Sequence, residues 1–380
     1  MLLSYGAKNF CCFKEWMEID LSLNSKVPIE VSQSMRATTT ICIKGANASG
    51  KTNALKALSF ISFFCTDSFS VKPEADILFE PFFDSSEPSE FFVNFEIKGS
   101  DYLYELVVIK KEVLSEKIFK KEPRETLILH REGSKLATNL LFDSDKFNIT
   151  DRKNASLISV ARQFVIPELE PFYSFFNSAR ANVSFEGFAK GGVLSVKNLS
   201  KIYKENATMF AFTKKYLKEF DTGIVDVALV ENKDTKGETY LYPKFSSSVD
   251  GEQKTLTYRQ QSRGTQELFE LLAFFGDTLI NGGILILDEF DVFLHPDILP
   301  HLVKMFTNSK TNPKKAQFVF STHNTDIIDY MGKYRTVLVV KENGKSFSYR
   351  LDEIDDVILR NDRPISPVYK TGRLGGVPRI

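Results

Sequence analysis

A glycine-rich stretch near the start of the chain has the residue types that bind nucleotide phosphates. Residues 45–52 read Gly-Ala-Asn-Ala-Ser-Gly-Lys-Thr, which fills every fixed position of the pattern Gly-x4-Gly-Lys-Ser/Thr. Its glycines allow consecutive backbone N–H groups to curve around a phosphate, and the N-terminus of a following helix adds about half a positive charge. The Lys51 ammonium can bind the β- and γ-phosphates, and the Thr52 hydroxyl can bind Mg²⁺. The predicted phosphate-binding residues are Gly45, Ala46, Asn47, Ala48, Ser49, Gly50, Lys51, Thr52 and Asn53.

Two consecutive carboxylates follow an aliphatic stretch in the second half of the chain. Residues 284–287 read Ile-Leu-Ile-Leu, and Asp288 and Glu289 come next. Four aliphatic residues in a row indicate a strand buried on both faces, and open α/β sheets bind their ligands at the carboxyl ends of such strands. We expect Asp288 to hold Mg²⁺ through water and Glu289 to polarise the attacking water as a general base. A strand that merely ends in a polar turn is the alternative, which the phosphate-binding loop disfavours.

Ser262, Gly264 and His323 lie where two predicted elements begin or end. Ser262 and Gly264 open a predicted helix, and a serine there can be a helix N-cap and nothing more. A hydroxyl beside a helix N-terminus is also what the γ-phosphate of a nucleotide on a second subunit needs, so both interpretations stay open. His323 follows a predicted strand and can hydrogen-bond the γ-phosphate or the attacking water. A lone histidine at a strand end is usually structural, so His323 matters only because of its neighbours.

Alternating strands and helices at both ends of the chain must position these residues. We predict strands within residues 1–21 and at 38–43, a helix buried on most sides at 52–64, and an antiparallel meander with strands at 91–97, 102–110 and 126–131. Helices follow at 157–177 and 199–220, and short strands at 223–230 and 239–243. The last part has a helix from Thr265, a strand at 283–287, a helix after Pro296 and a strand at 317–321. This order predicts an α/β core interrupted by an insertion.

The composition is that of an ordinary globular chain without an excess of either charge. Of the 380 residues, 49 are basic and 49 acidic, which gives a net charge of zero. Binding of a polyanion over the whole surface relies on an excess of Lys and Arg and is disfavoured, whereas a local basic patch stays open. The four cysteines lack the spacing of a zinc site or a disulfide framework. The adjacent Cys11 and Cys12 are expected in a strand, facing opposite sides of it.

The sequence predicts a cytoplasmic protein without membrane contact. Lys8, Glu15, Glu18 and Asp20 lie in the N-terminal stretch where a signal peptide needs an unbroken apolar run. No uncharged apolar stretch approaches the roughly 20 residues that a membrane span needs.

The order of these motifs resembles the ABC-type ATPase head of the SMC and RecF proteins. In that resemblance residues 45–52 are the Walker A loop, Asp288 and Glu289 the Walker B pair, and His323 the switch histidine. It further implies that residues 262–266 are the signature loop and Asp291 the D-loop aspartate, and that Ser262, Gly264 and Asp291 contact nucleotide. Arg263 stands where the family's LSGGQ signature has a small residue, and no Q-loop glutamine is evident.

The fold that this resemblance implies is an ABC-ATPase-head-like P-loop fold with an antiparallel β meander and a helical insertion. The first ATPase lobe, with Walker A and the meander, is expected at residues 1–155, and the helical insertion at 156–222. The second lobe, at residues 223–380, would hold the signature, Walker B, the switch histidine and a basic C-terminal tail.

Two other segments resemble a narrower group. Residues 288–296 and 321–324 resemble the OLD- and RecF-like AAA ATPases of bacterial phage-defence operons. Residues 369–378 are similar to the ending of the RloA group, which includes AriA, the ATPase subunit of the PARIS defence system. The resemblance implies ATP and Mg²⁺ as ligands, and an ATPase sensor or scaffold that controls a separately encoded effector, often a nuclease.

We therefore expect an ATPase that forms a homodimer or a higher homo-oligomer through its nucleotide sites. Glu289 and His323 are the expected catalytic residues, and Thr52 and Asp288 the expected metal ligands. Hydrolysis can be slow or stimulated by a partner. Two alternatives stay open: a RecF-like DNA-repair ATPase that loads on DNA, and a scaffold that binds nucleotide without hydrolysing it. The sequence leaves binding of nucleic acid undecided.

Overall fold

A mostly parallel sheet at the centre of the molecule brings the sequence motifs side by side. The structure is a computed structural model that describes residues 1–143, 151–184, 187–188, 195–220, 223–233, 237, 239–354, 359 and 363–377. In order across the sheet, its strands are β18 (Lys345–Arg350), β17 (Thr336–Glu342), β3 (Thr40–Lys44), β16 (Gln317–Ser321), β15 (Ile284–Leu287) and β9 (Ala179–Ala181). Neighbouring strands are parallel except for the antiparallel pair β17–β18. Every residue of β3, β15 and β16 is buried, as expected for strands covered on both faces.

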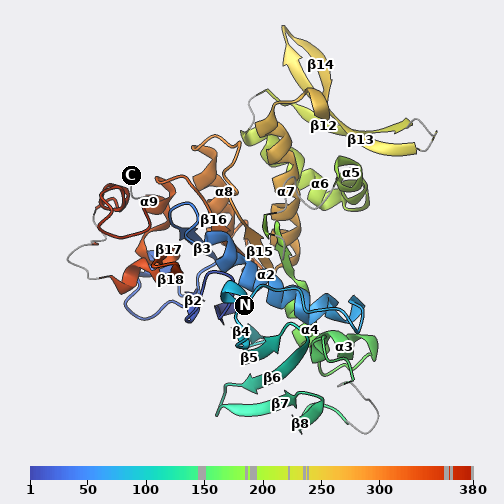
Figure 1. Cartoon of the computed structure of the whole chain (residues 1–380). Coiled ribbons are helices and arrows are strands. Elements are labelled where there is room, and N and C mark those ends of the chain that lie inside the picture. Colours follow the sequence, from blue (N-terminus) through green and yellow to red (C-terminus); the bar gives the residue numbers. More distant parts are fainter. Residues whose placement is uncertain are drawn as a thin grey trace.

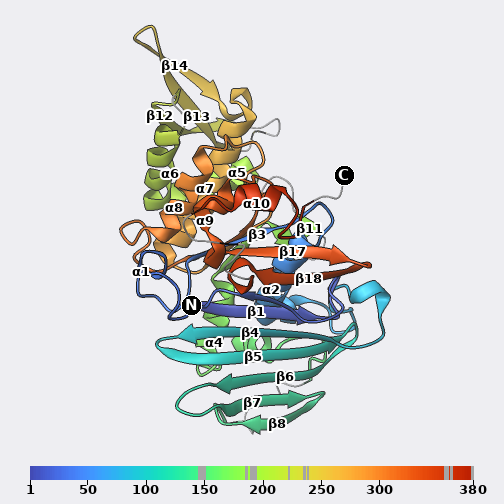
Figure 2. The same cartoon turned by 90° about the vertical axis from the view of Figure 1, so that its left-hand side faces the viewer.

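The predicted meander is part of a second, antiparallel sheet. Its strands, in order, are β2 (Met17–Asp20), β1 (Leu2–Lys8), β4 (Ser89–Ile97), β5 (Ser100–Ile109), β6 (Glu112–Lys120), β7 (Thr126–Glu132) and β8 (Lys135–Asn139). Buried and partly exposed residues alternate along β4 and β5, so one face of this sheet packs on the core. Figure 2 shows β1 and β4 to β8 stacked below β17 and β18.

Helix α2 (Lys51–Asp67) lies between the two sheets and begins at the phosphate-binding loop. Its side chains Leu55, Leu58, Ile61 and Phe64 are buried in one core with residues of both sheets. Two further helices, α3 (Leu157–Gln163) and α4 (Glu170–Asn177), pack against it. The prediction of a helix buried on most sides is confirmed, and this burial fixes the loop relative to both sheets.

Helices cover the other face of the central sheet. Of these helices, α7 (Arg263–Asn281) and α8 (Ile298–Thr307) contact its strands, and α5 (Val196–Glu205) and α6 (Ala207–Phe220) pack on α7. Their apolar residues form a core with Leu285, Leu287, Phe318 and Phe320 of the sheet. A three-stranded antiparallel sheet, formed by β12 (Asp226–Lys233), β13 (Thr239–Val249) and β14 (Glu252–Thr257), extends beyond α5 to α7 (Figure 1). The remaining short elements are α1 (Ile29–Ser32), β10 (Val183–Ser184), β11 (Gly187–Phe188), α9 (Ile327–Met331) and α10 (Ser366–Lys370).

The two longest predicted helices are each interrupted, so the prediction of continuous helices is wrong there. The segment 157–177 forms α3 and α4. Between them Val165 has a positive φ of 55°, and Pro167 has no backbone N–H to donate within a helix. The segment 199–220 forms the end of α5 and all of α6. At the break, the Asn206 side-chain oxygen accepts a hydrogen bond from the Met209 N–H at 3.0 Å and starts a new helix.

Other differences concern short elements. Strands β6, β8, β9, β10, β11, β14, β17 and β18 are absent from the prediction, and Cys11 and Cys12 lie in a turn rather than in a strand. Reciprocal backbone hydrogen bonds between Phe10 and Phe13, at 2.9 and 2.8 Å, close that turn. The division of the chain at residues 155 and 222 stays a prediction. The predicted helical insertion at residues 156–222 contains β9, which pairs with β15, so this segment also contributes a strand to the central sheet.

Candidate functional site

The carboxyl ends of four parallel strands meet at one edge of the central sheet. The phosphate-binding loop follows β3, Asp288 and Glu289 follow β15, and His323 comes two residues after the end of β16. Asn182 follows β9 on the far side of β15. This edge is where open α/β sheets bind ligands, so the topology gathers the predicted motifs where a ligand would lie.

The loop between β3 and α2 takes a backbone course that favours glycine at both of its glycine positions. Gly50 ends the loop at φ +115°, a backbone conformation that residues other than glycine rarely adopt. A Cβ on Gly45 would lie 2.2 Å from the Val339 carbonyl oxygen, so only glycine fits beside β17. The Lys51 ammonium donates to the carbonyl oxygens of Gly45 and Ala46, both at 3.1 Å. Burial lowers the pKa of Lys51, while nearby Asp288 and Glu289 oppose that shift.

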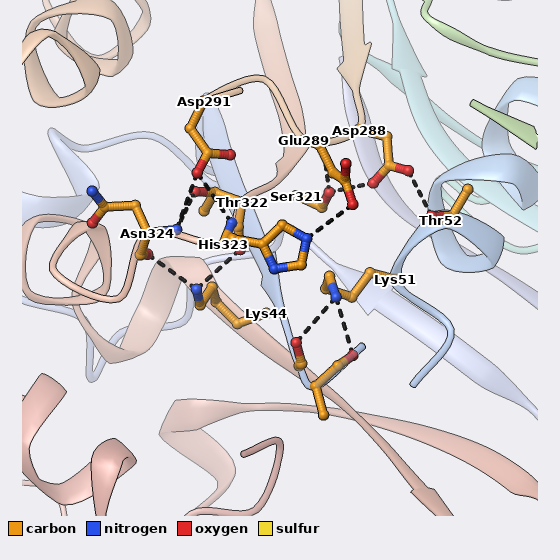
Figure 3. A network of polar contacts seen from close by, with 12 residues as sticks. Lys44, Lys51, Thr52, Asp288, Glu289, Asp291, Ser321, Thr322, His323 and Asn324 are labelled. Atoms are coloured by element: carbon orange, nitrogen blue, oxygen red, sulfur yellow. Dashed lines mark hydrogen bonds and ion pairs between the residues drawn. The ribbon is translucent and has the colours of Figure 1, made fainter. Parts of the chain in front are cut away.

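Thr52 and Asp288 form an oxygen-rich pair at the start of α2. The Thr52 hydroxyl donates to Asp288 Oδ2 at 2.6 Å, and the Asp288 side chain is buried (Figure 3). Ser321 donates its hydroxyl to the other carboxylate oxygen of Asp288, and Ser321 Oγ accepts from the Glu289 N–H at 2.9 Å. A hydroxyl beside a carboxylate matches the hard oxygen ligands that Mg²⁺ prefers. These donors therefore fit the predicted metal.

Glu289 and His323 face each other across the mouth of the site. His323 Nε2 lies 2.9 Å from Glu289 Oε1, within hydrogen-bonding distance (Figure 3). Both side chains are partly exposed, and Glu289 has a positive φ of 48°. A strained backbone that turns a carboxylate toward solvent is typical of functional sites. The pair has the geometry of a general base oriented by a neighbour.

Asp291 and Lys44 hold the turn that carries His323. Asp291 Oδ2 accepts from the N–H groups of His323 and Asn324 at 3.2 and 3.1 Å, and the buried Lys44 ammonium donates to the Thr322 and Asn324 carbonyls at 3.0 Å. Burial lowers the pKa of Lys44. The direct contact of Asp291 with nucleotide stays a prediction, because within the described residues its bonds are to this turn.

Asn182 is a residue of the site that the sequence does not reveal. Its side-chain amide donates to the Asp288 carbonyl at 3.0 Å, and its amide oxygen accepts from the Asp288 N–H at 2.7 Å. Its own N–H donates to the Ile286 carbonyl at 3.1 Å. One side chain thus fixes both backbone groups of the buried aspartate. The single available signal was an asparagine directly after three residues that could form an edge strand.

A cavity of about 470 Å³ opens between the loop and Glu289. It is lined by Cys12, Asn47, Ala48, Gly50, Lys51, Thr52, Asn53, Glu289, His323 and Lys341. Ser262 and Gly264 are not among these residues. Ser262 caps α7 by accepting from the Thr265 N–H at 3.1 Å, and Gly264 packs against the Phe293 backbone. The structure therefore brings Lys51, Thr52, Glu289 and His323 to one cavity, with the buried Asp288 bonded to Thr52, and leaves the predicted signature residues outside it.

The C-terminal segment packs beside the start of the phosphate-binding loop. Tyr369 donates its hydroxyl to the Gly376 carbonyl at 2.7 Å, and the Lys44 ammonium lies 5.8 Å from the Tyr369 ring centroid. Tyr349 of β18 donates to the Leu374 carbonyl. The described part of this tail is thus held against the sheet.

The central sheet, with a glycine-rich loop, a buried aspartate and a glutamate bonded to a histidine at its carboxyl edge, has the fold of an ABC-type ATPase head. A structure of the Smc head bound to the C-terminal winged-helix domain of ScpA has the same fold. Its TM-score is 0.51 at 11% sequence identity, and the match covers 93% of this chain and 99% of that one. The chain belongs to the family described as "AAA domain, putative AbiEii toxin, Type IV TA system", whose sequence profile matches residues 41–329, about three quarters of the chain.

Two other solved structures match with lower TM-scores. The SMC head domain from Thermotoga maritima matches with a TM-score of 0.45 and 15% identity, over 92% of this chain and 98% of that one. An Smc head from Pyrococcus furiosus, bound to the C-terminal domain of ScpA, has a TM-score of 0.46 and 14% identity over 93% and 97%. No curated protein matches the chain in sequence. No helix among the described residues is long and apolar enough to cross a bilayer.

Proposed function

We propose that the chain binds ATP with Mg²⁺ in the cavity beside the phosphate-binding loop and hydrolyses it. The observation that carries this proposal is the hydrogen bond between Glu289 and His323 at the mouth of the same cavity that Lys51 and Thr52 line. A loop that only held a nucleotide as a structural ligand would not need a carboxylate bonded to a histidine at the mouth of the cavity. Membership of an AAA family and the ABC-type head fold support an ATPase.

In this proposal some residues of the site bind the phosphates and others activate the attacking water. The backbone N–H groups of the loop and the Lys51 ammonium bind the phosphates. To do so, Lys51 gives up its hydrogen bonds to the Gly45 and Ala46 carbonyls and donates to phosphate oxygens instead. Thr52 and Asp288 would hold Mg²⁺, which neutralises phosphate charge when bound. Glu289 takes a proton from water as the water oxygen bonds to the γ-phosphorus and the bond to the β–γ bridging oxygen breaks, giving ADP and phosphate. His323 orients Glu289 during this step.

Lys51→Ala tests the binding half of the proposal. Loss of the ammonium removes the main positive charge from the loop, so MgATP should no longer bind measurably in a calorimetric titration. Lys72→Ala is a matched control, because Lys72 is an exposed lysine that does not line the cavity. ATP affinity that is equal in the wild type and Lys51→Ala would overturn the proposed site.

We also propose that each site is completed by a second copy of the chain. Ser262 and Gly264 at the N-terminus of α7 would contact the γ-phosphate bound to the partner, since they lie outside the cavity of their own chain. The exposed Phe293 beside them, stacked under Arg263 at 5.1 Å, gives this surface an apolar group. Hydrolysis would remove the γ-phosphate contact and weaken the interface between the two copies, so the dimer would switch between an ATP-bound state and a looser state after hydrolysis.

We further propose that this switch controls a separately encoded effector in defence against phage. The family description names a toxin of a toxin–antitoxin system, and residues 369–378 resemble the ending of phage-defence ATPases. Co-expression with the product of the neighbouring gene tests this proposal. The expected result is that the two proteins co-purify and that growth stops on infection only when both are present. Protection that persists without the second gene would contradict the proposed effector.

A further inference from the structure

The β17–β18 hairpin forms a wall of the cavity that the proposed function leaves unexplained. β17 lies on one side of β3, whereas β16 and β15, which lead to His323 and Glu289, lie on the other. Thr336, Val337 and Leu338 of β17 pair in parallel with Cys42, Ile43 and Lys44 of β3. The carboxyl end of β17 therefore continues beside the phosphate-binding loop, and Lys341 near that end lines the cavity.

The hairpin is fastened to the loop and to the turn beside it. The Ser346 hydroxyl donates to the Ser49 carbonyl at 2.6 Å, and the Ser346 N–H donates to the Cys12 carbonyl at 2.9 Å. Ser346 pairs across the hairpin with Lys341. Because the Val339 carbonyl also lies directly against Gly45, the backbone that carries Lys341 has a fixed position relative to the loop.

Lys341 is a cation at the cavity without a partner among the described residues. Lys51 and Lys44 both donate to backbone carbonyls, and Lys44 is buried away from the cavity. Lys341 is exposed, and although its backbone pairs with Ser346, its ammonium forms neither a hydrogen bond nor an ion pair within the described part of the chain. A bound triphosphate would bring several negative charges into this cavity. Its phosphate oxygens are therefore suitable ligands for the unpaired Lys341 ammonium on the cavity wall.

We infer that Lys341 is a further nucleotide contact, whose ammonium binds a phosphate from the side of the loop opposite Glu289. This inference rests on the proposed binding of ATP and adds a residue that its motifs do not include. The contact would be a charge-assisted hydrogen bond from the Lys341 ammonium. The side chain has no other partner among the described residues, whereas the backbone that carries it is held in place. Lys341 would thus set nucleotide affinity without taking part in activation of water.

Lys341→Gln tests this inference against a matched control on the same hairpin. Lys345→Gln removes the same charge from β18, but Lys345 does not line the cavity. Titration of MgATP and MgADP should give a Kd about tenfold higher in Lys341→Gln for at least one of the two nucleotides. Lys345→Gln should bind like the wild type, and Lys341→Arg should recover most of the affinity. Rising salt should weaken binding less in Lys341→Gln than in the wild type.

The outcomes separate this inference from the proposed function. If wild-type protein binds neither nucleotide, the proposed function fails and the role of Lys341 with it. If the wild type binds MgATP and Lys51→Ala does not, the proposed site stands. Equal affinities of the wild type, Lys341→Gln and Lys345→Gln would then overturn the inference about Lys341 alone, as would equal losses in the two glutamine variants.

Discussion

Three residues from three different elements hold the Asp288 side chain and backbone. Thr52 of α2 and Ser321 of β16 bond its carboxylate oxygens, and Asn182 after β9 bonds its N–H and carbonyl groups. Burial of a carboxylate is costly unless its oxygens are hydrogen-bonded, so these contacts are what keep Asp288 in place. A metal ligand with such support has a fixed orientation, and loss of one supporting group typically costs 10- to 100-fold in activity or metal affinity.

We predict that Asn182→Ala weakens use of Mg²⁺ more than it weakens binding of the phosphates. The variant frees the Asp288 backbone but leaves the phosphate-binding loop unchanged. Half-maximal hydrolysis should require roughly tenfold more Mg²⁺, whereas ATP affinity measured in EDTA should stay within twofold of the wild type. Asn232→Ala, at an exposed asparagine of β12, should match the wild type in both measurements. An unchanged Mg²⁺ requirement in Asn182→Ala would contradict the positioning role.

The motif residues could be predicted from the sequence because their spacing reflects chemistry that local chain geometry imposes. Glycines and Lys51 must be close in sequence to surround one phosphate, and Asp288 must directly follow a buried strand. Asn182 and Lys341 have no such local constraint. They reach the site through strand order, since β9 lies beside β15 and β17 beside β3. A single sequence does not reveal which strands become neighbours.

At the scale of elements, a buried polar cluster ties the antiparallel sheet to the helices around α2. Glu116 of β6 accepts hydrogen bonds from the Tyr104 hydroxyl, the Ser156 hydroxyl and the Leu157 N–H at 2.9, 2.6 and 2.9 Å. Arg131 of β7, also buried, lies 3.9 Å from the same carboxylate. Burial raises the pKa of Glu116, and Arg131 and these hydrogen bonds oppose that shift. The cluster joins β5, β6, β7 and the start of α3.

We predict that Glu116→Ala lowers the free energy of unfolding by about 3–5 kcal/mol, because it leaves the buried Arg131 without its counter-charge. Glu125→Ala is a suitable control. Glu125 pairs with Lys121 on the surface of the same sheet, and an exposed pair contributes less than about 1 kcal/mol. Urea unfolding followed by circular dichroism gives both values. Equal destabilisation by the two variants would show that the buried cluster has no special role.

Strand β6 also shows why part of the fold was missed. Residues 117–124 look like a solvated run of charges in the sequence. In the structure, residues 112–120 form a strand that buries Val113, Glu116 and Ile118, and a shift of its register against β5 between Val113 and Ser115 breaks the alternation. A buried glutamate at a position normally taken by an apolar residue obscures the period-two pattern. The continuous buried stretches of β3, β15 and β16 have no such ambiguity, and all three strands are predicted from the sequence.

At the scale of the whole molecule, the proposed function requires two copies of the chain. Ser262→Asp gives a sharp test, because Asp caps a helix as well as Ser does and therefore keeps α7 intact. Its negative charge would repel the γ-phosphate on the partner. In a Glu289→Gln background with MgATP, we expect a dimer by light scattering with Ser262 and mostly monomer with Ser262→Asp. Ser262→Asn, a neutral cap of the same size, should retain far more dimer. A mass that does not depend on ATP would refute assembly through the nucleotide sites.

The central claim is that Glu289 activates water for hydrolysis of ATP bound at the phosphate-binding loop. Single-turnover conversion of radiolabelled MgATP, with protein in excess, tests it most directly and also detects slow hydrolysis. The wild type should convert its bound ATP to ADP. Glu289→Gln should retain ATP and convert it at least about 100-fold more slowly, since general-base catalysis contributes that much or more. Equal rates in the two proteins, or no conversion by the wild type, would contradict the claim.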